Sequence, residues 1–268
     1  MAAGERGPPV IQDIIAWLSD PAHWTGEDGV LRRTLEHLGY SGIALVIAAV
    51  IAIPAGLVIG HTGRGRFAVV NLAGAARAIP SLGLLFLLFL FLAPRVSGDA
   101  AFLWPSLIAL VVLAIPPILS GAYAGVESVD PAARDAARGM GMTGPAVLLR
   151  VEFPCALPLV FSGLRSAALQ IVATATIAAI VGLGGLGRFL IDGQKSRDFP
   201  QMASGALVVA VLALLVDFLF ALAQRYAVSP GLTGRGARAT MRHTEVAVRA
   251  AAGETEAIRP VDRSRSRQ

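Results

Sequence analysis

Long apolar stretches are the feature that most constrains the fold of this chain. The segment from Gly39 to Gly60 carries no charged residue, and at a rise of about 1.5 Å per residue a helix of this length crosses a hydrocarbon core of roughly 30 Å. Similar stretches cover about 67–93, 102–120, 155–181 and 202–224. With 55% hydrophobic and 15% charged residues, the chain of 268 residues is too apolar for a soluble domain. The sequence therefore predicts an all-α membrane protein with about five membrane-spanning helices.

Glycines and a proline within these stretches bear on how the spans pack. Gly56 and Gly60 form a G-x-x-x-G pattern in the first span. Such a pattern either lets another helix approach closely or reflects the abundance of small residues in membrane helices, and the sequence leaves both readings open. The second stretch is interrupted by Arg77 and Pro80, so it forms either one broken span or a half-span followed by a full one.

A polar island between Asp130 and Pro158 interrupts the apolar sequence. Because it lies between segments that can cross a bilayer, its own helix must lie in water. Asp130 is suited to cap that helix and Pro131 to occupy its first position, while the glycines from Gly139 onward break it. A second short amphipathic piece follows, and we expect Pro154 to stop it. The island is therefore a predicted docking element.

The spacing of residues in the island resembles the EAA signature of ABC-importer permeases, E-A-A-x3-G-x9-I-x-L-P. The matching positions are Asp135, Ala136, Ala137, Gly141, Val151, Phe153 and Pro154. Three of them differ from the signature but keep its chemical type, with Asp for Glu, Val for Ile and Phe for Leu. In that family the motif is a cytoplasmic coupling helix that seats in a groove of the ATP-hydrolysing subunit. The resemblance implies that these residues and Gly139 couple the chain to ATP hydrolysis.

The resemblance also implies a fold, a location and a set of partners. The fold is the all-helical transmembrane domain of a type I ABC importer, with its coupling helix in the cytoplasm. The location is the bacterial cell membrane (the inner or plasma membrane), which the chain crosses several times. The partners are an ABC ATPase subunit, an extracytoplasmic substrate-binding protein, a second copy of the permease or a related permease subunit, and the lipid bilayer.

Within this family the chain is most similar to permeases for osmoprotectant quaternary amines, such as glycine betaine, carnitine, choline and proline betaine. The similarity includes residues 130–143 and the run 173–187. Because the second of these is also similar to methionine permeases, a methionine or other amino-acid permease is the alternative. The N-x5-R-x-I-P arrangement from Asn71 to Pro80 resembles the second span of amino-acid and osmolyte permeases. It favours counting residues 67–93 as one span.

Ionisable residues and glycines inside the spans are candidates for a gate or a transport pathway. Arg77, Arg165 and Asp217 lie within spans, where ionisable side chains usually face the interior of a helix bundle or a partner. We expect Asp217 to pair with Arg165 or with Arg77, either as part of a gate or as a structural clamp. The further gate or pathway candidates are Pro80, Thr174, Thr176, Gly182, Gly184, Gly185 and Gly187.

The glycine run 182–187 matches the pattern G-x-G-x-x-G. A dinucleotide site would need a strand before the run, a helix after it and an acidic residue about twenty positions on. We expect none of the three here. The glycines instead predict a tight, non-helical turn at the end of a membrane helix, followed by a polar loop over 193–201.

The sequence offers little for catalysis or metal binding. The four histidines are scattered, and the single cysteine, Cys155, shows no metal-ligand spacing. The motifs H-E-x-x-H, G-x-S-x-G and G-x4-G-K-[ST] are absent from the sequence. We therefore expect neither catalysis by this chain, nor a cofactor, nor a bound metal, and an importer built on it must use the ATPase of a separate subunit. A membrane enzyme or assembly factor is the competing class.

The chain is expected to divide into three parts. Residues 1–38 form an N-terminal amphipathic segment at the membrane interface, and residues 39–226 form the permease domain, with the coupling-helix loop at 121–155. Residues 227–268 form an Arg-rich cytoplasmic tail that we expect to be disordered. The net charge is +5, but no aromatic residues interleave with the basic residues of the tail, so nucleic acid is not an expected partner.

Five spans place the two ends of the chain on opposite sides of the membrane. The resemblance puts the island in the cytoplasm, together with the turn 61–66 and the tail. The N-terminus and residues 182–201 then lie outside. The distribution of Lys and Arg over the short loops gives this orientation little support, so the orientation depends on the resemblance.

Overall fold

The structure, a computed structural model of the chain, describes residues 10–67, 69, 71, 74 and 78–228. The chain divides into two units, Met1–Gln224 and Arg225–Gln268, and the first unit contains the elements discussed below except for the last three residues of the final helix. Arg77 lies outside the described residues, as does nearly all of the tail predicted over 227–268.

Four helical runs among the described residues are long and apolar enough to cross a membrane. They are α2 (Val30–Thr62), α5 (Ala100–Glu127), the run Gly144–Val181 that contains α8 (Phe153–Ala178), and α10 (Phe199–Ala227). The shorter helices are α1 (Val10–Ser19), α4 (Ser81–Leu92), α6 (Pro131–Gly139), α7 (Gly144–Val147) and α9 (Gly187–Ser196). The described residues contain no β-strand, so the predicted all-α fold is confirmed.

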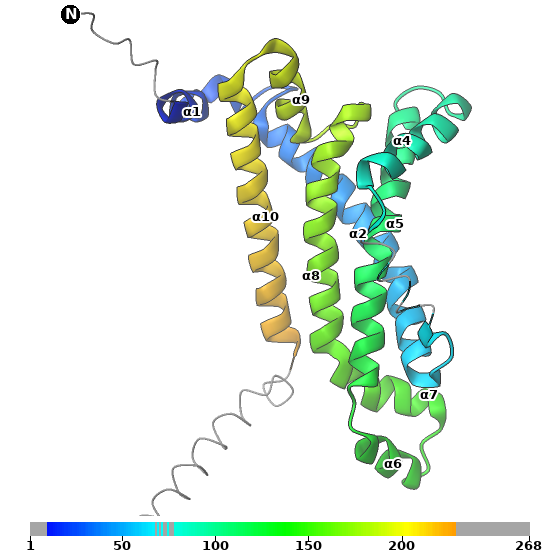
Figure 1. Cartoon of the computed structure of the whole chain (residues 1–268). Helices are drawn as coiled ribbons and strands as arrows, with labels where there is room; N and C mark the ends of the chain where they lie inside the picture. The colour runs from blue at the N-terminus through cyan, green and yellow to red at the C-terminus, as the bar shows by residue number, and fades with distance from the viewer. Residues whose placement is uncertain (1–9, 68, 70, 72–73, 75–77, 229–268) are drawn as a thin grey trace, which may run out of the picture. The chain divides into compact units, whose positions relative to one another are not determined.

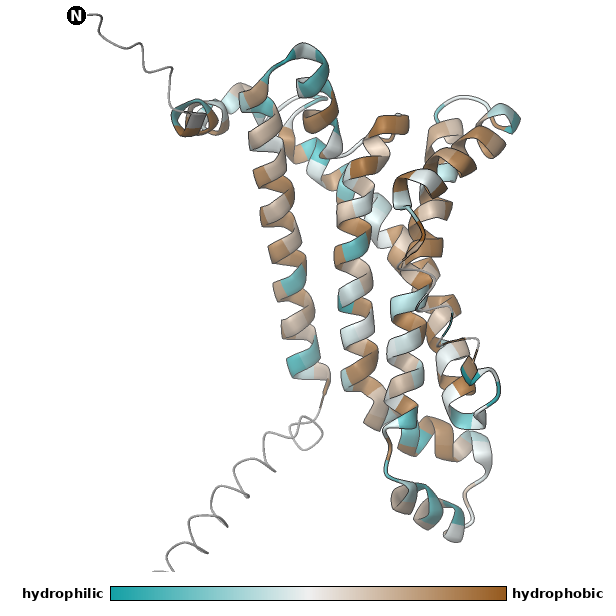
Figure 2. Ribbon diagram, in the orientation of Figure 1, coloured by the Kyte–Doolittle hydropathy of each residue, from teal (hydrophilic) through white to brown (hydrophobic). Residues whose placement is uncertain are grey.

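Helices α2, α5 and α8 form the packed centre of the first unit, and Figure 1 shows α2 running diagonally behind the other two. Their contact surfaces are rich in alanine. The buried residues there include Ala44, Ala48, Ala52, Ala114, Ile118, Ala167 and Ile171. Because small side chains let helix backbones approach closely, van der Waals packing contributes much of the contact between these helices. Figure 2 shows hydrophobic colour along the long helices and hydrophilic colour over much of α6.

The G-x-x-x-G pattern of α2 lies directly against α5. A Cβ atom built on Gly56 would lie 2.7 Å from the Cβ of Ala122, and one built on Gly60 would lie 2.7 Å from the Cβ of Val126. Both distances are shorter than carbon atoms tolerate. The structure therefore supports the reading in which this pattern permits a close helix contact.

The second predicted span is divided at Pro80. The described residues between Arg66 and Ala78 are helical, and α4 begins after the proline. Proline disfavours helical geometry in the residue before it, which explains a break at this place. Helix α4 has 12 residues, a length of about 18 Å, which is shorter than a hydrocarbon core of roughly 30 Å. The structure thus shows four full-length helices and one interrupted apolar segment, and the count of five spans stays a prediction.

The glycine run ends the third long helical segment, as the sequence predicts. Gly182 and Gly185 have φ angles of 99° and 89°, a left-handed conformation that glycine adopts without steric cost. Gly187 packs so tightly that a Cβ atom there would lie 2.1 Å from the carbonyl oxygen of Thr176. The predicted tight turn is confirmed.

Two predictions for the residues after the turn are wrong: that no helix follows the glycine run, and that residues 193–201 form a polar loop. Helix α9 follows the glycine run directly, and α9 and α10 together occupy most of the loop predicted over 193–201. Helix α9 is short and its sequence is mostly polar, but it buries Phe189, whose ring packs edge-on against Trp17 at a centroid distance of 5.6 Å. The partner lies near the other end of the chain, so the local sequence gives no sign of this contact.

Pro154 does not stop a helix, contrary to the sequence-based expectation. The chain stays helical from Gly144 to Val181, and residues Leu148–Glu152 form a wider π-helical turn just before the proline. A proline lacks the N–H of a regular helix and its ring collides with a carbonyl of the preceding turn. A π-helical turn is wider than an α-helical one and accommodates such an irregularity, so the island runs directly into α8.

Candidate functional site

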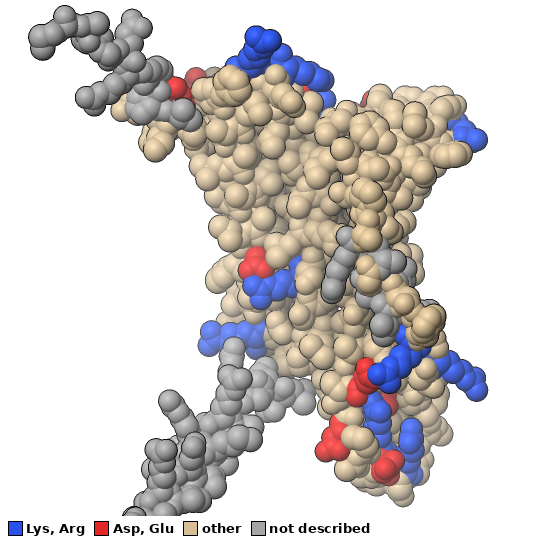
Figure 3. Space-filling model, viewed as in Figure 1, with Lys and Arg blue, Asp and Glu red and all other residues tan. Residues whose placement is uncertain are grey.

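The signature loop forms a short helix with a mostly exposed surface. The Asp130 side chain accepts a hydrogen bond from the backbone N–H of Ala132 at 2.9 Å and caps α6, as predicted. Asp135 has a side chain that is 75% exposed and lies 3.7 Å from the Arg138 guanidinium. The only buried residue of α6 is Ala137. Figure 3 shows acidic and basic side chains gathered at this end of the molecule, which suits a polar docking surface.

The structure separates the signature residues into two groups. Asp135, Ala136, Gly139 and Gly141 are exposed on α6 or just after it, and Gly141 has a φ angle of 83° that ends the helix. Ala137 is the one buried signature residue of α6, and Val151, Phe153 and Pro154 are half-buried at the base of α8. The first group is therefore available to a partner, and the second group anchors the loop to the long helix.

Glu152 is a buried residue of the loop that sequence reasoning missed. Its carboxylate is 1% exposed and lies 2.6 Å from Nδ1 of His61 at the end of α2. It also lies 2.9 Å from Nε of Arg134 on α6. This contact is an ion pair, because its geometry does not meet that of a hydrogen bond. The only sequence signal is a carboxylate in the short amphipathic piece after α6, at a position that the signature leaves unspecified.

A groove of about 650 Å³ runs along the surface formed by the start of α4 and by α5 and α8. Its polar lining residues are Ser81, Ser120, Ser162, Ser166, Gln170 and Thr174. Among the described residues that line it, no side chain is charged or aromatic. Thr174, a predicted pathway candidate, lies in this groove, whereas Pro80 and Thr176 are not part of its lining, and Thr176 donates a hydrogen bond to the Val172 carbonyl of its own helix at 3.1 Å.

The polar residues of α8 form a stripe along this groove. Ser162, Ser166 and Gln170 are exposed and recur every four residues, so they lie on one face of the helix. A row of hydroxyl and amide groups at membrane depth is poorly solvated by lipid. This face therefore fits contact with water or with another protein better than contact with lipid.

Asp217 binds Arg165, one of the two partners expected for it. Arg165 Nη2 donates a hydrogen bond of 2.5 Å to Asp217 Oδ2, and Nε donates to Oδ1. This two-pronged ion pair joins α8 to α10. A second polar contact, from Gln224 Nε2 to the carbonyl oxygen of Pro158 at 3.1 Å, joins the same two helices. Because only 11% of the apolar stretch of α10 is buried against the rest of the chain, these polar contacts contribute much of its attachment.

Replacing Asp217 by asparagine should loosen α10 and lower the melting temperature of the detergent-purified protein by several degrees, because Arg165 would keep an unpaired charge at membrane depth. The control is the double variant R165L/D217L, which removes both charges and should recover most of that loss. Transport that stays low in the recovered double variant would indicate a gate, and transport that recovers would indicate a clamp. A D217N protein with unchanged stability and unchanged transport would contradict both roles.

The glycine run lies against the first turns of α2. The Glu36 carboxylate accepts a hydrogen bond from the backbone N–H of Gly185 at 3.0 Å, and a Cβ atom on Gly184 would lie 2.6 Å from the same carboxylate oxygen. The run is thus held by backbone contacts that only glycine permits.

Within the described residues, no group of three or more His, Cys, Asp or Glu side chains is placed to hold a metal ion.

Comparison with known proteins gives the same assignment over most of the chain. Residues 52–229 match the family described as "Binding-protein-dependent transport system inner membrane component". The glycine betaine/carnitine/choline transport system permease protein OpuCB of Bacillus subtilis is 31% identical over 205 residues, which cover 76% of this chain and 91% of that protein. The osmoprotectant import permease protein OsmW of Salmonella typhimurium is 33% identical over 69% of this chain and 86% of its own length.

Solved structures agree with the fold. An inward-facing structure of the MetNI methionine ABC transporter superimposes with a TM-score of 0.65 at 22% identity, over 79% of this chain and 100% of the matched chain. At this identity the likeness shows the fold alone, which is the predicted type I importer fold. The chain therefore belongs to the family of binding-protein-dependent transport system inner membrane components, the multi-pass permease subunits of ABC importers.

Proposed function

We propose that this chain forms the translocation pathway for a quaternary-amine osmoprotectant, such as glycine betaine, carnitine, choline or proline betaine. The observation that carries the proposal is the similarity to permeases named for glycine betaine, carnitine and choline over about three quarters of the chain, with 31% identity in the example from Bacillus subtilis. The alternative, a methionine or other amino-acid permease, is supported by the methionine transporter structure, but at 22% identity that likeness reaches only to the fold.

The groove on α4, α5 and α8 suits such a solute. A quaternary ammonium group has no N–H to donate, and proteins that bind it tightly use aromatic cages. The described lining offers hydroxyl and amide groups with neither aromatic rings nor charges. Weak, uncharged contacts let a solute enter and leave a pathway. We therefore expect the extracytoplasmic binding protein, rather than this groove, to select the solute.

We also propose that a second permease closes the groove. The stripe of Ser162, Ser166 and Gln170 is exposed on the single chain, and a pathway across a membrane needs walls on every side. A second copy of this chain, or a related permease, placed over α5 and α8 would supply the missing wall. In this arrangement the exposed face of α6 seats in the ATPase subunit on the cytoplasmic side, and the end with α9 faces the binding protein.

The test is uptake of radiolabelled glycine betaine, choline and methionine by cells that express the chain with its ATPase and its binding protein. We expect saturable, ATP-dependent uptake of at least one quaternary amine and none of methionine. Cells that lack only this chain are the control for endogenous transport. Uptake of methionine alone would contradict the proposed substrate and establish the alternative.

A further inference from the structure

We propose that Glu152 is a positioning residue that joins the coupling helix α6 to α2, so that the two helices move as one body during transport. This inference deepens the proposed function, since it assigns the path by which movement of α6 enters the membrane helices. It concerns a side chain that the signature does not specify and that stands apart from the groove.

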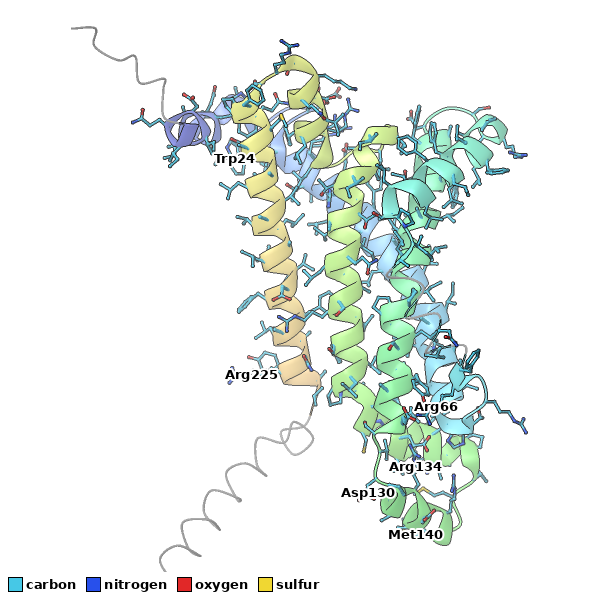
Figure 4. All side chains as sticks on the ribbon, viewed as in Figure 1. Trp24, Arg66, Asp130, Arg134, Met140 and Arg225 are labelled. Atoms are coloured by element: carbon cyan, nitrogen blue, oxygen red, sulfur yellow. The ribbon has the colours of Figure 1, made fainter. Side chains whose placement is uncertain are left out.

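The Glu152 carboxylate contacts side chains from two other elements. One of its oxygen atoms lies 2.6 Å from Nδ1 of His61 at the end of α2, and the other lies 2.9 Å from Nε of Arg134 on α6. Arg134 also donates through Nη2 to the carbonyl oxygen of Val126, near the end of α5. In Figure 4, Arg134 lies on the side of α6 that faces the long helices, whereas Met140 lies at the far end.

Through Arg134, this network ties α6 to Glu152 and to the end of α5. Only Ala137 of α6 is buried, so apolar packing holds the helix weakly. Glu152 is 1% exposed, and a buried carboxylate is stable only while its partners compensate the charge. When a partner protein displaces α6, separating Arg134 from Glu152 would leave that charge uncompensated. The ends of α2 and α5 that contact this network are therefore expected to move with α6.

The opposite end of α2 contacts the glycine run. Glu36 accepts a hydrogen bond from the Gly185 N–H at 3.0 Å, and Nε2 of His37 lies 3.1 Å from the carbonyl oxygen of Val172 on α8. Helix α2 is continuous over 33 residues, which is about 50 Å. Because packed helices move as bodies rather than stretching, a displacement that enters α2 at His61 reaches the turn at Gly185.

The first arm of the test uses the complete complex in proteoliposomes, with uptake of radiolabelled glycine betaine and ATP hydrolysis measured together. The variants are Glu152→Gln and Arg134→Met. We expect both to keep ATP hydrolysis within about twofold of the wild type and to lose about fivefold or more in solute moved per ATP, in the range of typical coupling energies. The second variant matters because it leaves Glu152 and its contact with His61 in place and removes only the ion pair to α6.

Glu127→Gln is the matched control. Glu127 forms an ion pair with Arg66 at 3.2 Å near the same end of the molecule, but its side chain is 45% exposed, and exposed pairs contribute little. We expect this variant to transport and hydrolyse like the wild type. A Glu152→Gln complex with wild-type transport per ATP would overturn the proposal. So would a loss of assembly in both test variants, since the network would then act as a determinant of the fold.

A second arm needs no transported solute. Spin labels at Arg138→Cys on α6 and Ile43→Cys on α2, in a Cys155→Ala background, report the distance between the two helices. We expect one narrow distance that ATP leaves unchanged in the otherwise wild-type complex, and a broad distribution after Glu152→Gln. If neither glycine betaine nor choline is transported but these distances behave as expected, the proposed substrate is contradicted and this inference stands. Unchanged distances after Glu152→Gln would overturn it.

Discussion

Replacing Gly56 by leucine is expected to destroy the packing of α2 against α5. A Cβ atom at this position would already lie 2.7 Å from the Cβ of Ala122 and 2.7 Å from the carbonyl oxygen of Leu119. Leucine adds three further carbon atoms to a contact that has no room for one. Overpacking of this kind costs typically about 1–3 kcal/mol, and at a backbone contact we expect the upper end of that range or more. The variant should lose its monodisperse peak in size-exclusion chromatography and melt well below the wild type.

Gly42→Leu is the matched control, because it makes the same change on the same helix. No atom lies within 4 Å of a Cβ built on Gly42, so the new side chain meets open space. Leucine also favours the helix over glycine, by up to about 1 kcal/mol. We expect this variant to melt at or slightly above the wild-type temperature. If Gly56→Leu melted together with Gly42→Leu, the close contact between α2 and α5 would be contradicted.

The membrane helices were predictable because their signal is local. An uncharged run such as Gly39–Gly60 has one stable form in lipid, a helix with every backbone group paired. The role of Gly56 and Gly60 was not settled by the sequence, because the pattern is the same whether a helix or lipid lies opposite. Only the packing against α5 decides between the two. The number of spans stays open for a related reason, since Pro80 divides an apolar segment without showing which part crosses the bilayer.

The signature loop was predictable where its signals are local and not where its contacts are distant. Asp130 and Pro131 set the start of α6 and the glycines set its end, as the sequence indicates. Glu152 was missed because its partner His61 lies 91 positions away, and the fold alone brings the two together. The partner of Asp217 had two candidates for the same reason, and the structure pairs it with Arg165, 52 positions earlier.

Replacing Gly141 by aspartate is expected to reduce uptake about tenfold or more, within the range of typical coupling energies, while the chain itself still folds. Gly141 has a φ angle of 83° and no atom within 4 Å of a built Cβ. The new side chain therefore meets nothing within the chain, and its internal cost is the left-handed backbone, about 1–2 kcal/mol. Any larger effect must come from a partner surface against this loop, which we propose to be the ATPase subunit.

The variant Gly98→Asp distinguishes an effect of the partner protein from an effect of the strained backbone. Gly98 lies just before α5, at the end opposite α6, with a φ angle of 67° and no atom within 4 Å of a built Cβ. It imposes the same strain and the same added charge at a place remote from the signature loop. We expect Gly98→Asp to retain uptake and ATP hydrolysis, and Gly141→Asp to lose uptake with the complex still in the membrane. Because the two variants share the left-handed backbone and the added charge, an equal loss in both would remove the support for α6 as the coupling element, whereas a loss confined to Gly141→Asp supports a partner seated on this loop.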